Sequence, residues 1–314
     1  MFKKINFKSL LIIFGGLLVF MILLQIIRRS GGERNFKDKL FEVYTAKVSA
    51  IIIKPRSEKT EIRLVRSGNV WTFTTKNKTY KAEKTVIEGM LLELSRMKAE
   101  RIAATDKSDW AQFDVTDTLS TRVKAEQGGK LVADFLVGKF SYQQSNQSAY
   151  TYVRLYNEDE VYAVNGFLAM SFNKSVNDLR NKTLVNVNQK DISRLTFSYP
   201  ADSSFTLSKS NKFWNINGEK ADSTKVASYL SSVANLSGYN FVDDAVLQGP
   251  QAFLLKIEGN NFPPLELKAF VSDTTNHYFI TSNLNPDARF SAAKDNLIKR
   301  VFVGARQFKI SQKK

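Results

Sequence analysis

The chain contains one succession of elements twice, and this duplication constrains its fold more than any other feature of the sequence. Residues Val48–Pro55 and Ile192–Pro200 are apolar, β-rich runs that end in proline, as expected where a strand meets a turn. In each copy a strand, a polar turn and a second strand carrying a tryptophan follow. Trp71 and Trp214 stand at nearly the same distance from the start of their copies. The repetition predicts two structural units of one kind.

Each copy continues with an amphipathic helix and then returns to strands. Apolar residues recur there at steps of three and four, which predicts a helix with one face in the core. Asp222 or Ser223 is the expected N-cap of the second helix. A further helical pattern over residues 167–179 closes the first copy. The two stripes are Ile87, Met90, Leu91, Leu94 and Met97, and then Val226, Tyr229, Leu230 and Val233.

An uncharged apolar run covers residues 10–27 and has basic residues on both sides. At a rise of 1.5 Å per residue it would be about 27 Å long, which predicts a transmembrane helix. A cleaved signal peptide is the alternative, but the flank at residues 25–30 lacks a small-x-small cleavage site. The chain has no cysteine, which excludes a lipoprotein anchor. We expect a single-pass protein of a bacterial inner membrane with its C-terminal domain in the periplasm.

The expected fold class is α+β, with an N-terminal transmembrane helix followed by two tandem repeated α+β modules with antiparallel sheets. Residues 1–9 form a short basic tail, and residues 28–45 form a stalk between the helix and the modules. The first module is predicted over residues 46–190 and the second over residues 191–314.

The formal net charge of +16 is concentrated at the two ends of the chain. A nucleic-acid binder usually carries its excess on the folded domain, so we expect no nucleic-acid partner. Basic ends suit contact with anionic lipid head groups. The alternative is that they only keep the protein soluble. The candidate residues for membrane-surface contact are Arg28, Arg29, Arg34, Lys37, Lys39, Lys299, Arg300, Lys313 and Lys314.

The sequence shows little catalytic chemistry. The single histidine, His277, would need an orienting carboxylate and a nucleophile to act as a base. Asp243 and Asp244 could perform acid–base work only if a cleft held them together, and a loop or cap is the simpler interpretation. Tyrosines that alternate near residues 150–162 could stack on sugars, although a half-buried strand face also selects tyrosine. We predict no catalytic, cofactor-binding or metal-binding residues, and no cofactor.

Several motifs resemble an uncharacterised membrane-anchored family, domain of unknown function 4340. They are the tryptophan-bearing strands, the helix, the strand Phe135–Gly138, and the run Leu179–Val185 that leads into Asp191. The resemblance covers most of residues 46–245. The family often has a Gly-Leu-x-x-Pro element, where this chain has residues 113–117 without proline. The resemblance implies no catalytic residues and a role beside an ABC-type exporter, as in gliding-associated auxiliary proteins.

Envelope proteins of Bacteroidota-like bacteria can carry O-linked glycans on a serine or threonine that follows aspartate. Thr118, Ser223 and Thr274 fit this short pattern, and Ser223 has a helix cap as its alternative role.

Three functions remain open at this stage. The first is a non-enzymatic, membrane-anchored accessory protein that presents a duplicated domain to an ABC-type transport system or cell-envelope complex. The second is an envelope module that binds glycan or lipid. The third is an envelope hydrolase that uses Asp243, Asp244 or His277.

Overall fold

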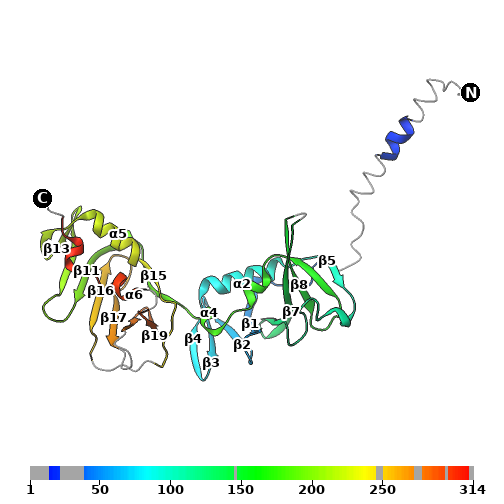
Figure 1. Ribbon diagram of the computed structural model, residues 1–314, viewed down its shortest axis with the longest axis horizontal. Helices are drawn as coiled ribbons and strands as arrows, with labels where there is room; N and C mark the ends of the chain where they lie inside the picture. The colour runs from blue at the N-terminus through cyan, green and yellow to red at the C-terminus, as the bar shows by residue number, and fades with distance from the viewer. Residues whose placement is uncertain are drawn as a thin grey trace, which may run out of the picture. The chain divides into compact units, whose positions relative to one another are not determined.

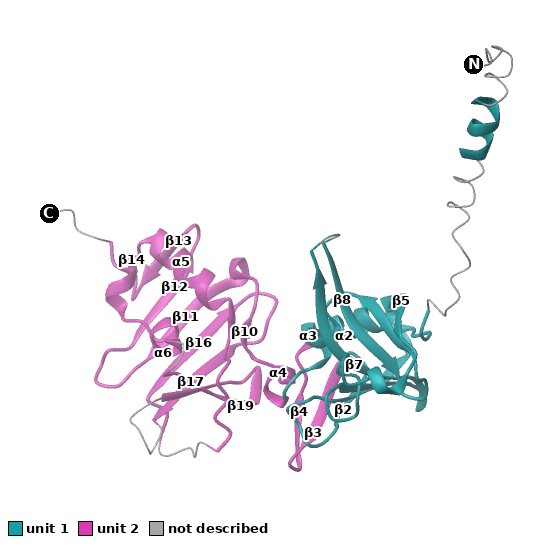
Figure 2. Ribbon diagram, turned by 45° about the vertical axis from the view of Figure 1, so that its right-hand side comes forward, with its two compact units in different colours: residues 1–69, 85–175 teal, residues 70–84, 176–314 magenta. Residues whose placement is uncertain are grey.

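The computed structural model describes residues 14–21, 39–144, 147–244, 250–271, 278–293 and 296–310 (Figure 1). The chain divides into two compact units, which Figure 2 distinguishes by colour. Unit 1 comprises residues 1–69 and 85–175, and unit 2 comprises residues 70–84 and 176–314.

The first sheet has nine strands in the order β4-β3-β2-β1-β6-β7-β8-β9-β5. Alternation of buried and exposed side chains is clearest in β6, where Thr121, Val123 and Ala125 are buried and their neighbours are not. The strands are β1 (Val48–Lys54), β2 (Ile62–Ser67), β3 (Val70–Thr75), β4 (Lys78–Lys81), β5 (Ala99–Ala104), β6 (Thr121–Gln127), β7 (Lys130–Gln143), β8 (Ser148–Leu155) and β9 (Val161–Asn165).

The second sheet has eight strands in the order β14-β13-β12-β11-β16-β17-β18-β19, and β10 pairs with β15 in a separate two-stranded sheet. The strands are β10 (Thr183–Asn186), β11 (Ile192–Ser198), β12 (Phe205–Ser210), β13 (Phe213–Ile216), β14 (Glu219–Lys220), β15 (Asn235–Ser237), β16 (Phe253–Gly259), β17 (Leu265–Val271), β18 (Tyr278–Ser282) and β19 (Asn285–Ser291).

The two sheets repeat one topology, since strands β1–β4 and β6–β9 have the same order as β11–β14 and β16–β19. The repetition extends to an irregularity. The pairing of β1 with β6 shifts register between Val48 and Ala50, and the pairing of β11 with β16 shifts between Ile192 and Arg194. The copies differ after their first helix, because β5 joins the first sheet at β9 whereas β15 pairs with β10.

The helices described after residue 38 are short. They are α2 (Lys84–Arg96), α3 (Leu168–Phe172), α4 (Val176–Leu179), α5 (Ser223–Val233) and α6 (Leu297–Val301). Short 3-10 helices lie at η1 (Thr45–Lys47), η2 (Lys107–Asp109), η3 (Gln189–Asp191) and η4 (Ala305–Phe308). Asp222, not Ser223, is the N-cap of α5, and its carboxylate accepts hydrogen bonds from the backbone N–H groups of Thr224 and Lys225.

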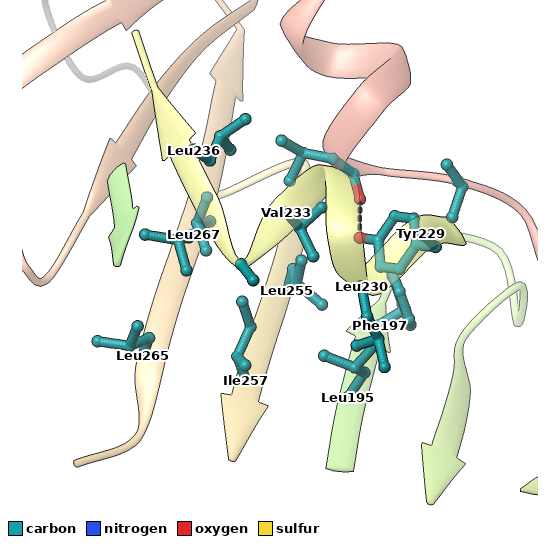
Figure 3. Packing of buried hydrophobic residues seen from close by; sticks show 14 of the residues in the cluster. Leu195, Phe197, Tyr229, Leu230, Val233, Leu236, Leu255, Ile257, Leu265 and Leu267 are labelled. Carbon is teal, nitrogen blue, oxygen red and sulfur yellow. Dashed lines mark hydrogen bonds between the residues drawn. The ribbon is translucent and has the colours of Figure 1, made fainter. Parts of the chain in front are cut away.

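The core of unit 2 lies between its main sheet and α5 (Figure 3). Tyr229 on α5 is buried among these side chains, and its hydroxyl donates a hydrogen bond of 2.6 Å to the carbonyl oxygen of Val301. Full burial raises the pKa of Tyr229 well above its ordinary value, because the phenolate would lose its hydration. The sheet contributes Leu195, Phe197, Leu255, Ile257, Leu265 and Leu267 to this core.

The predicted α+β class is wrong, because the structure is mostly β, with 45% of the described residues in strands and 22% in helices. The sequence predicts antiparallel strands with one covering helix in each module. Short polar strands such as β4 and β14 carry too little apolar periodicity to be predicted, yet they pair with their neighbours and extend each sheet.

The predicted transmembrane helix and the inner-membrane, single-pass location are also corrected. None of the helices among the described residues has the length and apolarity needed to cross a membrane. Within the predicted span 10–27, residues 14–21 are helical, and residues 10–13 and 22–27 lie outside the described ranges.

Candidate functional site

Among the described residues of unit 2, Arg180 is the only charged residue that is buried. It follows α4 directly and forms an isolated antiparallel bridge with Ala82, just after β4. Its side chain is only 3% exposed. A guanidinium at that depth needs compensation, because it has lost its hydration and cannot be deprotonated in a protein.

A carboxylate supplies the compensating charge. Asp243, in the loop after β15, accepts two parallel hydrogen bonds of 2.7 Å from the two terminal nitrogen atoms of Arg180. This bidentate, charge-assisted geometry is the strongest that an arginine makes with a carboxylate. The Asp243 side chain remains 34% exposed, so solvent reaches the pair on the side of Asp243 but not on the side of Arg180.

Two aromatic rings enclose the same guanidinium. Its central carbon lies 3.6 Å from the ring centroid of Phe241 and 4.3 Å from that of Tyr80. Such stacking favours the planar cation through the ring quadrupole. The pKa of Tyr80 is raised, first by burial and then by the negative charge of Asp243. We call these four residues, Tyr80, Arg180, Phe241 and Asp243, the arginine clamp.

The arginine clamp joins segments of unit 2 that are distant in sequence, and its charged groups satisfy one another. Both carboxylate oxygens of Asp243 accept hydrogen bonds from Arg180. Asp244 is exposed in the adjoining turn and contributes to the raised pKa of Tyr80. His277 lies outside the described residues. Of the three residues considered for catalysis, Asp243 is therefore the one that the structure pairs with another charged side chain, that of Arg180.

A second candidate site is a groove of about 590 Å³ in unit 1, between α2 and α3. We call it the α2–α3 groove. Most of its lining is apolar, and two of the lining side chains are largely open to solvent, Phe167 at 51% and Met170 at 70%. The groove is lined by Thr85, Val86, Gly89, Met90, Phe167, Met170, Ser171 and Lys174.

The apolar surface continues from the groove onto the long strand β7. The ring of Phe140 stacks on the ring of Phe167, with centroids 5.0 Å apart and an interplanar angle of 19°. Phe140 is 41% exposed, and Tyr142, two residues further along the same face of the strand, is 55% exposed. Phe167 belongs to the helical pattern over residues 167–179, and only the structure shows that it faces solvent.

The tyrosines considered for sugar stacking do not present open faces. Tyr152 and Tyr162 are buried, at 9% and 4% exposure. The guanidinium of Arg122 covers the ring of Tyr156, at 3.3 Å from its centroid, and Tyr150 packs against the small cluster that contains Tyr152. Their alternation therefore reflects burial and packing on the strand face.

The remaining predicted residues are scattered. Thr118 is exposed in a turn before β6, and Ser223 is exposed at the first position of α5. Lys39 pairs with Glu42 at 2.6 Å in unit 1, whereas Lys299 and Arg300 are exposed on α6 in unit 2. The others, Arg28, Arg29, Arg34, Lys37, Thr274, Lys313 and Lys314, lie outside the described residues. Glycosylation and membrane-surface contact therefore remain predictions.

The fold and the two sites define a duplicated antiparallel β-sheet protein with a buried arginine clamp and an apolar surface groove. The family described as "Domain of unknown function (DUF4340)" matches residues 71–252, more than half of the chain, and the protein belongs to that family. The match includes Arg180 and Asp243 of the clamp. No curated protein matches the chain significantly.

Proposed function

We propose that this protein is a non-enzymatic accessory subunit that binds another protein through unit 1. The observation that carries the proposal is the exposed apolar surface formed by Phe140, Tyr142, Phe167 and Met170, which are 41–70% exposed. A scattered exposed apolar residue needs no explanation, but a contiguous group at a groove is typical of an interaction site.

The arginine clamp supports an accessory role. Its acidic and basic groups are committed to each other, and its aromatic rings stack on the arginine, which favours a role in holding segments of unit 2 together. The wider setting that we propose is an ABC-type transport system or another cell-envelope complex. That setting rests on the family resemblance alone, which is an association and transfers no mechanism.

The test is to purify the full-length chain from its native cells and to measure the mass of the complex that it forms. We expect a defined complex with at least one other protein in fixed stoichiometry. Recovery of the chain at its own mass of 35.6 kDa under all gentle extraction conditions would contradict the proposal. A hydrolytic activity that Asp243→Asn abolishes without unfolding the protein would replace it with the enzymatic alternative.

A further inference from the structure

We infer that the α2–α3 groove accepts one face of an amphipathic helix from a partner protein, with a carboxylate of that helix next to Lys174. The inference rests on the proposed function and adds the binding surface and the chemistry of the partner. It follows from the shape of the groove, from the glycine in α2, and from the charge at its rim.

The groove has the form that a helix needs. Two helical segments, α2 and α3, supply its lining, with Met90 on one side and Phe167 and Met170 on the other. Because Phe167 and Met170 remain more than half exposed, the groove is shallow and open. A shallow apolar groove can receive the side chains of an amphipathic helix at positions i, i+3, i+4 and i+7.

Gly89 lies in the middle of α2 and lines the groove. A Cβ atom at this position would meet no atom within 4 Å, so packing inside this chain does not demand a glycine here. Its φ angle is also ordinary, which leaves no local conformational reason for it. The absent side chain leaves room beside the helix for the close approach of another chain.

The charge at the rim indicates what accompanies the apolar residues. Lys174 is the single charged residue in the groove lining, which includes no carboxylate. Among the described residues, no carboxylate lies within ion-pair distance of the Lys174 ammonium group. An acidic residue of the partner would complement this lysine.

The experiment places a photo-crosslinking phenylalanine analogue at Met170 in the full-length chain and irradiates it in native cells. The matched control carries the analogue at Phe213, which is 53% exposed and lies in unit 2. We expect a covalent adduct at position 170 whose partner peptide has apolar residues at helical spacing and an Asp or Glu beside them. We also expect Lys174→Glu and Gly89→Leu each to lower its yield at least fivefold, and Lys299→Glu to leave it unchanged.

Charge exchange completes the test. Replacing the partner's acidic residue with lysine should restore the adduct of the Lys174→Glu variant. Thermal unfolding checks that each variant is folded. An acyl-chain adduct, a peptide of this same chain, or an adduct indifferent to Lys174→Glu and Gly89→Leu would overturn the inference. Adducts that form only at other scanned surface positions would overturn it and leave the proposed function standing, whereas no adduct at any position would overturn both.

Discussion

Arg180 shows how a single residue can organise the surroundings of a site. Its guanidinium has a carboxylate along its edge and aromatic rings on its faces, so nearly every favourable contact of a planar cation is used. Attraction within such a pair offsets the loss of hydration only while both partners are present. The clamp is therefore sensitive to the loss of any one member.

We predict that Arg180→Lys lowers the free energy of unfolding by about 2–4 kcal/mol in urea denaturation, somewhat less than a fully buried pair because Asp243 is partly exposed. A lysine ammonium cannot make two parallel hydrogen bonds or stack as a plane on the rings. The control is Arg63→Lys. Arg63 also binds a carboxylate, that of Glu126, through two nitrogen atoms, but its side chain is 53% exposed. That variant should cost less than about 1 kcal/mol, and equal losses would contradict the role of burial.

At the scale of secondary-structure elements, two glycines in unit 1 have opposite surroundings. Gly138 lies where the pairing of β7 with β8 shifts register, and a Cβ there would lie 2.2 Å from the carbonyl oxygen of Phe113. Gly89 lies in α2 with open space around it. The first glycine is required by close packing, and the second lowers the stability of a helix that would tolerate alanine.

These surroundings predict opposite signs for one substitution. Gly138→Ala should destabilise the protein by about 1–3 kcal/mol, because the loop at Phe113 must move away from β7. Gly89→Ala should stabilise it by about 0.5–1 kcal/mol, which is the ordinary difference between glycine and alanine inside a helix. Urea unfolding of both variants measures this, and a loss of stability in Gly89→Ala would show that the open space is needed for folding.

Glu93 in α2 makes stability depend on pH. Burial raises the pKa of its carboxyl group, and the nearby charge of Arg96 offsets this in part. A raised folded-state pKa stabilises the protein at low pH, and this contribution is lost as pH rises through that pKa. Glu93→Gln should therefore raise Tm at neutral pH and leave it nearly unchanged below pH of about 4.

Glu126 is the control, because its pKa is shifted in the direction opposite to that of Glu93. Its pKa is lowered, first by the hydrogen bond from Arg63, so its ionised form stabilises the folded state above its unfolded pKa. Glu126→Gln should lower Tm at neutral pH. Thermal unfolding between pH of about 3 and pH of about 7, which bracket the ordinary carboxyl pKa of about 4, separates the two variants. Shifts of the same sign in both would contradict the assignment for Glu93.

At the scale of the whole molecule, the described residues from Lys39 onward are already part of the folded body of unit 1. Lys39 forms an antiparallel bridge with Lys98, and Leu40 is buried at 1% exposure. Val43 is also at the edge of the core, at 9%. The described residues ahead of this point, 14–21, are helical and exposed.

We expect deletion of residues 1–38, which removes neither Leu40 nor Val43, to leave the free energy of unfolding in urea within about 0.5 kcal/mol of that of the full-length protein. Deletion of residues 1–43 removes Leu40 and Val43 and should cost at least about 2 kcal/mol, as expected when large apolar side chains are lost from a core. Identical midpoints for the two truncations would show that Leu40 does not anchor the first sheet.

Much of the local structure was predictable from the sequence. The run that begins at Val48 is strand β1 and the run that begins at Ile192 is β11, because local apolar, β-branched patterns specify strands. Trp71 and Trp214 are both 8% exposed, and the apolar stripe of α5 is buried throughout. These features depend on residues that are close in sequence, so the spacing of apolar residues predicts them.

The tertiary structure alone decided which distant residues meet and which apolar residues remain outside. Arg180 and Asp243 are 63 residues apart, and no local pattern relates them. Phe167 belongs to the helical pattern over residues 167–179, and only the structure shows that it is the N-cap of α3 and faces solvent. The short strands β4 and β14 likewise form because neighbouring strands offer hydrogen-bond partners. Periodicity records which residues can share a face, but packing determines whether that face is covered and by which part of the chain.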